Sequence, residues 1–199
     1  MKANRRGISV GRDEKEKESY ASLLPEKIHR EFKSKFEQKV IELLESKHPV
    51  PPTRWTRLQP EEREILKGLA TDKESSIRTK AITSLVLSND KNHVRLLGEI
   101  ISNKNEDNLV RSVAAISLGM SKNPEAGKVL VKFVNDEDEF LRAKVVEAIG
   151  KVGEEEEIAV VKQASADKSP LVRSNAKGAS KLIEFRLGGL KKQKRGTSK

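Results

Sequence analysis

The sequence has no cysteine and few aromatic residues. Zero cysteine excludes a disulfide framework, thiolate metal sites and cysteine nucleophiles, and it favours a reducing compartment. No apolar run approaches the roughly 20 residues of a membrane-spanning helix, and residues 1–20 lack the apolar segment of a secretory signal. We therefore expect a soluble, cytoplasmic protein that does not contact a membrane.

Catalytic and metal-binding motifs are also missing. His29, His48 and His93 are isolated, with no second histidine at ligand spacing. The sequence contains neither G-x-S-x-G nor the phosphate-binding G-x(4)-G-K-[ST]. The acidic runs at 136–139 and 154–157 are expected at helix starts, where the helix dipole favours negative charge. The sequence thus predicts no enzyme, no cofactor and no bound metal.

What the sequence does contain is a repeat. Four arginines recur at spacings of 33, 31 and 31 residues, namely Arg78, Arg111, Arg142 and Arg173. A branched apolar residue precedes each arginine, and small or apolar residues follow most of them three and seven positions later. Six positions before the arginines stand Asp72, Asn105, Asp136 and Asp167. A fixed period of this length is typical of a stacked repeat architecture.

The aligned positions predict a helix–turn–helix unit. Val110, Ala114 and Leu118 would share one helical face. Good N-cap residues precede the arginines by four positions (Asp107, Asp138, Ser169), and glycines stand where the first helix is expected to end (Gly119, Gly150, Gly153). A second apolar run follows each first helix. One such unit cannot bury its own apolar face, so neighbouring units must stack.

The pattern D-x(4)-[VIL]-R, with the following apolar positions and second helix, resembles the HEAT repeat. The short period resembles the subclass named after phycobilisome lyases. The resemblance covers about residues 60–185 and implies an all-α, right-handed α-solenoid. It also implies a structural ladder, in which arginines pair with loop acids between stacked repeats; its members would be Asp72, Arg78, Arg111, Asp136, Arg142, Asp167 and Arg173.

The flanking segments complete the expected organisation. We expect a disordered charged tail over 1–20, a solenoid domain over 21–185 and a basic disordered tail over 186–199. Within the domain, residues 25–47 form an amphipathic capping helix whose apolar stripe is Ile28, Phe32, Phe36, Val40 and Leu43, and residues 48–59 form a proline-rich loop. Trp55, between Arg54 and Arg57, either fills the joint between this helix and the first repeat or serves as an exposed interface anchor.

Charge is unevenly distributed along the chain. The net charge is +10, yet residues 72–185 carry 18 positive and 18 negative side chains. The excess comes from residues 1–71 and from the C-terminal segment with Lys191, Lys192, Lys194 and Arg195. A surface that follows a phosphate backbone should be basic over consecutive units. The repeats do not have such a basic surface. The basic C-terminal segment therefore either binds a polyanion or only aids solubility.

These observations favour a non-enzymatic scaffold or adaptor that binds another protein within a larger assembly. In this repeat class the second helices generally line the concave side, which would place Lys67, Arg95, Glu99, Lys128, Lys132 and Lys162 on the binding face. The alternative is a nucleic-acid-associated protein anchored by its basic tails. A bilin lyase or chromophore-handling protein is a third reading, which rests on the resemblance alone.

Overall fold

The computed structural model describes residues 32–88, 90, 92–121 and 123–196, and the helices in this part belong to one compact unit that begins at Ser34. This part is helical and contains no strand. In chain order the α-helices are α2 (Lys35–Leu44), α3 (Pro52–Thr56), α4 (Pro60–Leu69), α5 (Ser75–Leu87), α6 (His93–Ser102), α7 (Asn108–Met120), α8 (Glu125–Val131), α9 (Glu139–Val152), α10 (Ile158–Gln163) and α11 (Pro170–Gly196). Short 3₁₀ turns flank α10.

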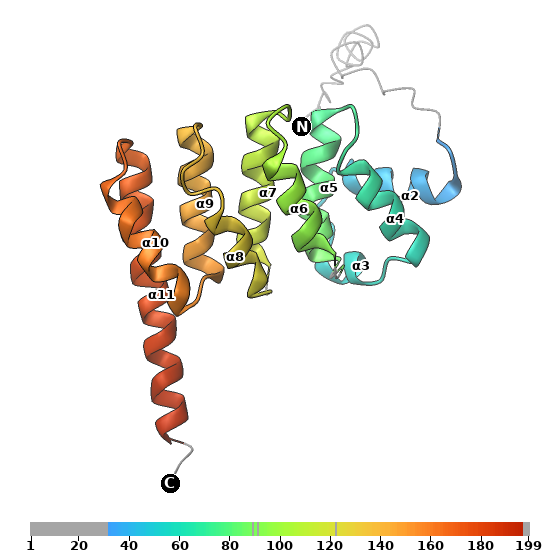
Figure 1. Ribbon diagram of the computed structural model, residues 1–199. Coiled ribbons are helices and arrows are strands. Elements are labelled where there is room, and N and C mark those ends of the chain that lie inside the picture. The colour runs from blue at the N-terminus through green and yellow to red at the C-terminus, as the bar shows by residue number, and fades with distance from the viewer. Residues whose placement is uncertain (1–31, 89, 91, 122, 197–199) are drawn as a thin grey trace, which may run out of the picture. The chain divides into compact units, whose positions relative to one another are not determined.

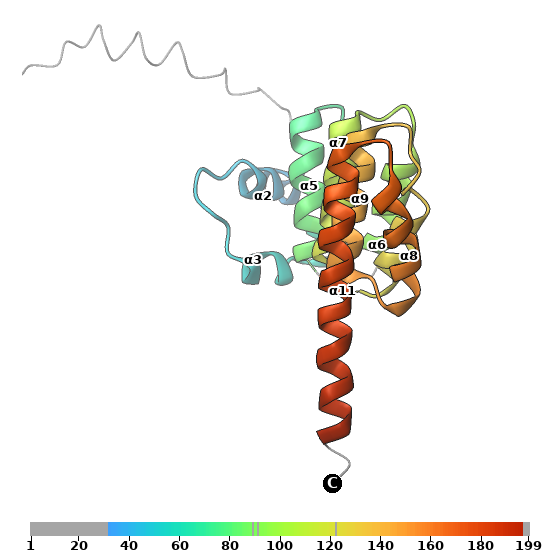
Figure 2. The ribbon, with the colours of Figure 1, turned by 90° about the vertical axis from the view of Figure 1, so that its left-hand side faces the viewer.

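The repeat helices form two layers (Figures 1 and 2). The first helices of the repeats, α5, α7, α9 and α11, stand side by side, and each contacts the next. The second helices, including α6, α8 and α10, lie on one side of this row. Val110, Ala114 and Leu118 are all buried between the layers. The all-α solenoid expected from the sequence is confirmed.

The first helices begin where the sequence predicts. The Asp107 carboxylate accepts a hydrogen bond from the Leu109 N–H at 2.7 Å, and the Asp138 carboxylate accepts one from the Leu141 N–H at 2.6 Å. Pro170 is the first residue of α11, a position where its missing N–H is tolerated. These caps satisfy backbone donors that a helix start leaves without partners.

The three glycines stand at the ends of first helices, as the sequence predicts, and Gly153 is the C-cap of α9. Gly119 lies in the last turn of α7 and Gly150 in the last turn of α9. A Cβ atom on Gly119 would lie 2.8 Å from the Cα of Ala148, and one on Gly150 would lie 2.7 Å from the Cα of Ala179. Gly119 and Gly150 therefore allow consecutive first helices to approach closely.

The N-terminal elements differ from the expected cap helix and loop. Helix α2 spans Lys35–Leu44, starts from the N-cap Ser34, and buries Val40, Ile41 and Leu44. Phe32 and Phe36, assigned to the apolar stripe, are exposed. The loop expected over 48–59 contains the helix α3. Residues 1–31, including the expected tail at 1–20 and Ile28, lie outside the described residues.

The C-terminal segment also differs, because α11 continues to Gly196 instead of ending near residue 185. Arg186, assigned to the disordered tail, has a structural role. Its guanidinium donates to the carbonyl oxygen of Lys151 at 2.8 Å and to those of Gly150 and Gly153, which lie at the end of α9. The structure describes residues 186–196 as part of α11, whereas the sequence predicts a disordered tail over 186–199. None of the helices described is both long and apolar enough to cross a bilayer.

Candidate functional site

A groove of about 450 Å³ runs between the second helices α6 and α8. Its apolar lining comes from Val94, Val129 and Phe133. At the floor of the groove Gly98 lets Val129 pack closely against α6, because a Cβ atom on Gly98 would lie 2.9 Å from Cγ1 of Val129. The polar lining comprises Arg95, Glu99, Ser102, Asn103 and Lys132. We call this set of residues the α6–α8 groove.

Charges of both signs border the groove. Nη1 of Arg95 lies 2.5 Å from Oε1 of Glu99, one helical turn away, and both side chains are exposed. Next to the groove, Nζ of Lys128 lies 2.9 Å from Oε1 of Glu125. The hydrogen bond from Lys128 to Glu125 raises the pKa of the lysine, which therefore stays charged at neutral pH. An apolar floor with a mixed charged border is suited to a segment that carries both apolar and charged groups.

The structure gathers some of the predicted interface residues and separates others. Arg95, Glu99 and Lys132 line the α6–α8 groove, and Lys128 is adjacent on α8. Lys67 instead sits on α4, 2.5 Å from Glu64 and 3.9 Å from the carboxylate of Asp90. Lys162 lies on α10 and contacts Glu184 at 3.0 Å. Neither residue lines the groove.

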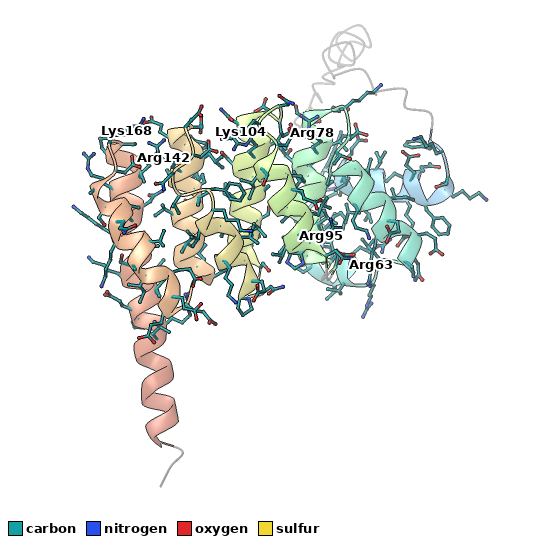
Figure 3. The ribbon with its side chains drawn as sticks, in the orientation of Figure 1. Arg63, Arg78, Arg95, Lys104, Arg142 and Lys168 are labelled. Carbon is teal, nitrogen blue, oxygen red and sulfur yellow. The ribbon has the colours of Figure 1, made fainter. Side chains whose placement is uncertain are left out.

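The repeat arginines sit at a different edge of the unit. Figure 3 shows Arg78 and Arg142 along the edge where the first helices begin, whereas Arg95 lies away from it. Nη1 of Arg142 donates to the carbonyl oxygens of Asp136 and Glu137 in its own loop, at 2.8 and 3.0 Å. Its remaining nitrogens donate to both carboxylate oxygens of Asp167 in the next repeat, each at 3.0 Å. One side chain thus fixes a loop and joins two repeats.

The other arginines vary this arrangement. Nη2 of Arg111 lies 2.6 Å from Oδ2 of Asp136. Nη2 of Arg78 lies 2.8 Å from Oε1 of Glu106. The residue aligned with Asp136 and Asp167 is Asn105, which has no carboxylate to pair with the arginine. Asp72, expected to be a ladder acid, binds the N–H of Glu74 through its carboxylate and Arg78 through its carbonyl oxygen. Arg173 donates to the carbonyl oxygens of Asp167 and Lys168.

Comparison with known proteins identifies the repeat. The family model described as HEAT repeats matches residues 62–132 and 94–180, which is more than half of the chain. The protein belongs to the HEAT-repeat family. The crystal structure of an engineered protein has the same fold, with a TM-score of 0.52, 17% identity, and coverage of 75% of this chain and 79% of that one.

One curated relative corrects the expectation that the chain is not an enzyme. Deoxyhypusine hydroxylase-B from Oryza sativa subsp. japonica is 23% identical over 128 residues, which is 63% of this chain and 42% of the relative. This HEAT-repeat chain is therefore similar to part of a protein named as an enzyme, and it spans less than half of that protein's length. The absence of familiar catalytic motifs does not support the non-enzyme expectation.

Trp55 packs inside the HEAT unit. It is 3% exposed and belongs to the hydrophobic core beside α2 and α5. The alternative that its ring is an exposed interface anchor is wrong. Arg54 is partly exposed, with Nη2 3.8 Å from Oε1 of Glu62, and Arg57 is exposed at the end of α3.

Sequence reasoning missed Glu62, which joins the three N-terminal helices. This fully buried side chain accepts a hydrogen bond from the Gln59 N–H at 2.9 Å, at the start of α4. It also lies 2.5 Å from Nζ of Lys39 on α2. Burial alone would raise the pKa of Glu62, but the hydrogen bonds from Lys39 and Gln59 outweigh burial and lower it. The capping-box signal, glutamate three residues after the N-cap, could have revealed its local role.

His93 was also missed as a contact between repeats. Its Nε2 lies 2.8 Å from Oγ of Ser121, and its Nδ1 contacts the carbonyl oxygen of Asp90.

In the part of the chain that the structure describes, no group of three or more His, Cys, Asp or Glu side chains could hold a metal ion. Lys191, Lys192, Lys194 and Arg195 lie on the last turns of α11.

Proposed function

We propose that the protein is a HEAT-repeat binding module whose α6–α8 groove takes a segment of another protein. The groove itself is the observation that carries this proposal. Val94, Val129 and Phe133 offer apolar surface to an inserted side chain. Recognition grooves commonly combine an apolar floor with a charged border.

The charge pattern favours a protein over a nucleic acid at this site. Arg95 and Lys128 lie within ion-pair distance of Glu99 and Glu125. The exposed Glu155 and Glu156 follow in the next repeat. A polyanion requires positive charge over several consecutive units. A partner segment with alternating charge matches this border better, and such complementarity sets specificity and association rate.

Charge reversal on α8 tests the proposal. The double variant Lys128→Glu, Lys132→Glu should weaken binding to a purified partner captured by this protein at least about tenfold, which corresponds to about 1.4 kcal/mol. The matched control is Lys177→Glu, Lys181→Glu, because these two lysines are also exposed and four residues apart, but on α11. Isothermal titration calorimetry measures the affinity, and thermal melts verify folding.

A second variant tests the apolar floor. Phe133→Ser should weaken binding of the same partner, because it removes apolar surface that lines the groove, and thermal melts again verify folding. The proposal is wrong if both groove variants bind normally while deletion of residues 191–199 abolishes binding. If binding of the wild-type protein also depends steeply on salt and is abolished by nuclease treatment, the result would favour the nucleic-acid alternative.

A cytoplasmic location stays a prediction of the sequence.

A further inference from the structure

An exposed apolar row follows the edge where the first helices begin. Leu109, Phe140 and Leu171 are each the second residue of their helix, and each stands two positions before a repeat arginine. Their exposed fractions are 60%, 44% and 45%. Single exposed apolar residues are ordinary, but three that recur at the same position of adjacent first helices indicate an interaction surface. We call these three residues the edge row.

The middle of the edge row has an acidic border. Asp107, Glu137 and Glu139 are exposed close to Leu109 and Phe140 in the sequence. Lys144 lies over the Phe140 ring, with Nζ 5.4 Å from the ring centroid. Lys104, labelled at this edge in Figure 3, is bound to Asp136 at 2.6 Å. Packed helices lie about 8–10 Å apart, so the row extends over roughly 20 Å. The part of the row around Leu109 and Phe140 suits a segment that is both apolar and basic, whereas the exposed Lys168 stands near Leu171 at the same edge.

The same chain carries such a segment. The distal half of α11 runs past the neighbouring helices of the described part (Figures 1 and 2). Leu182 and Phe185, near the middle of α11, are 52% and 85% exposed. Residues 182–196 contain five lysines and arginines, of which Arg186 binds the end of α9, and one acidic residue, Glu184, which lies 3.0 Å from Nζ of Lys162. We call residues 182–196 the α11 arm.

We propose that the α11 arm of one copy docks on the edge row of a second copy. Phe185 and Leu182 would cover apolar side chains of the row, and the basic end would face Glu137 and Glu139. Opposite charges at a contact steer association and fix orientation. The two surfaces differ, so the contact is heterologous, and repeated contacts of this kind produce head-to-tail chains unless they close into a ring.

Sedimentation velocity of the full chain tests the proposal. At about 200 µM protein and about 0.05 M salt, the average mass should exceed that of a monomer, and about 0.5 M salt should reduce it because exposed charges are screened. The row variant, Leu109→Ser with Phe140→Ser, and the arm variant, Phe185→Ser with Lys191→Glu and Lys192→Glu, should each be monomeric. Met120→Ser is the control, since Met120 is exposed at the other end of α7 and should leave association unchanged.

Mixing the two variants tests the direction of the contact. The row variant keeps its arm and the arm variant keeps its row, so an equimolar mixture should form two-chain species and nothing larger. If the row variant unfolds, the variant Glu137→Lys with Glu139→Lys replaces it, because these exposed side chains contribute no core packing. A monomeric wild-type protein, association that survives either variant, or a mixture that stays monomeric would each overturn the proposal.

Discussion

The Arg111–Asp136 pair should be the contact between repeats that contributes most to stability. Both side chains are 3% exposed, and Nη2 and Oδ2 lie 2.6 Å apart. Asp136→Ala would leave the Arg111 guanidinium buried, with the Ile101 carbonyl and the Asn108 side chain as remaining hydrogen-bond acceptors. Removing one partner of a buried ion pair typically lowers the free energy of unfolding by about 3–5 kcal/mol.

The other two ion pairs between repeats are more exposed, so truncating them should cost less stability. Asp167 in the Arg142 pair is 14% exposed, and both members of the Arg78–Glu106 pair are 13–14% exposed. Water can partly solvate the charge that truncation leaves behind at these sites. We therefore expect a loss of about 2–3 kcal/mol for Asp167→Ala and about 1 kcal/mol for Glu106→Ala.

The pH dependence gives an independent check. Burial alone would raise the pKa of Asp136, but hydrogen bonds from Arg111 and Lys104 outweigh burial and lower it from 3.8 to about 2. The stabilisation is complete above the unfolded-state pKa and is lost as the pH falls through the folded-state value, a change of about 2 kcal/mol. Asp136→Asn cannot titrate at this site. The stability difference between the wild-type protein and this variant should therefore shrink between pH 5 and pH 2.

Urea unfolding followed by circular dichroism measures these quantities for each variant. The reasoning is refuted if Asp136→Ala loses less than about 1 kcal/mol, or if Glu106→Ala loses more than Asp136→Ala. A stability difference for Asp136→Asn that stays constant on acidification would contradict the pKa assignment. Unchanged unfolding for all three alanine variants would mean that the arginine ladder does not hold the repeats together.

Two further predictions concern packing. Gly150→Ala should destabilise the protein by about 1–3 kcal/mol in thermal melts, because its Cβ would lie 2.7 Å from the Cα of Ala179. The control Gly178→Ala should be neutral or stabilising by up to about 1 kcal/mol, because a Cβ atom there would have no atom within 4 Å. Trp55→Ala should lower the free energy of unfolding by about 3–5 kcal/mol. In the native state the fluorescence emission of this single tryptophan should be blue-shifted and should resist quenching by iodide. Red-shifted, readily quenched emission would contradict its burial.

Local patterns made the repeat architecture predictable. The period of the arginines, the helix caps and the apolar positions all act within about one repeat, so the sequence displays them directly. Asp107 and Asp138 cap α7 and α9 as expected. The acceptor of Arg78 was not predictable from the aligned position, because Glu106 reaches it from the neighbouring position. Side-chain length and loop conformation decided that contact.

Contacts between distant residues explain the main failures. Gly119 stands at the end of α7, as the helix-end signal indicates, but its close approach to Ala148 in the following repeat could not be read from the local sequence. The segment after residue 185 has the composition of a disordered tail, but Arg186 binds carbonyl groups at the end of α9 and α11 continues. Of the predicted interface residues, Arg95, Glu99 and Lys132 share a groove because α6 and α8 are adjacent. No local pattern singled out the close approach of Val129 to Gly98 at the floor of this groove.

The outward surface of α11 indicates how the HEAT solenoid can and cannot assemble. In the inner repeats, positions one, four and eight after the arginine face the next first helix, and they are small or apolar: Ser112, Ala115 and Gly119 in α7, and Ala143, Val146 and Gly150 in α9. In α11 the same positions are Ser174, Lys177 and Lys181, all exposed. Stacking a similar repeat there would bury two ammonium groups against an apolar helix, which is strongly unfavourable without acidic partners. Self-association of this chain must therefore use another surface, and the α11 arm with the edge row provides one that requires no buried lysine.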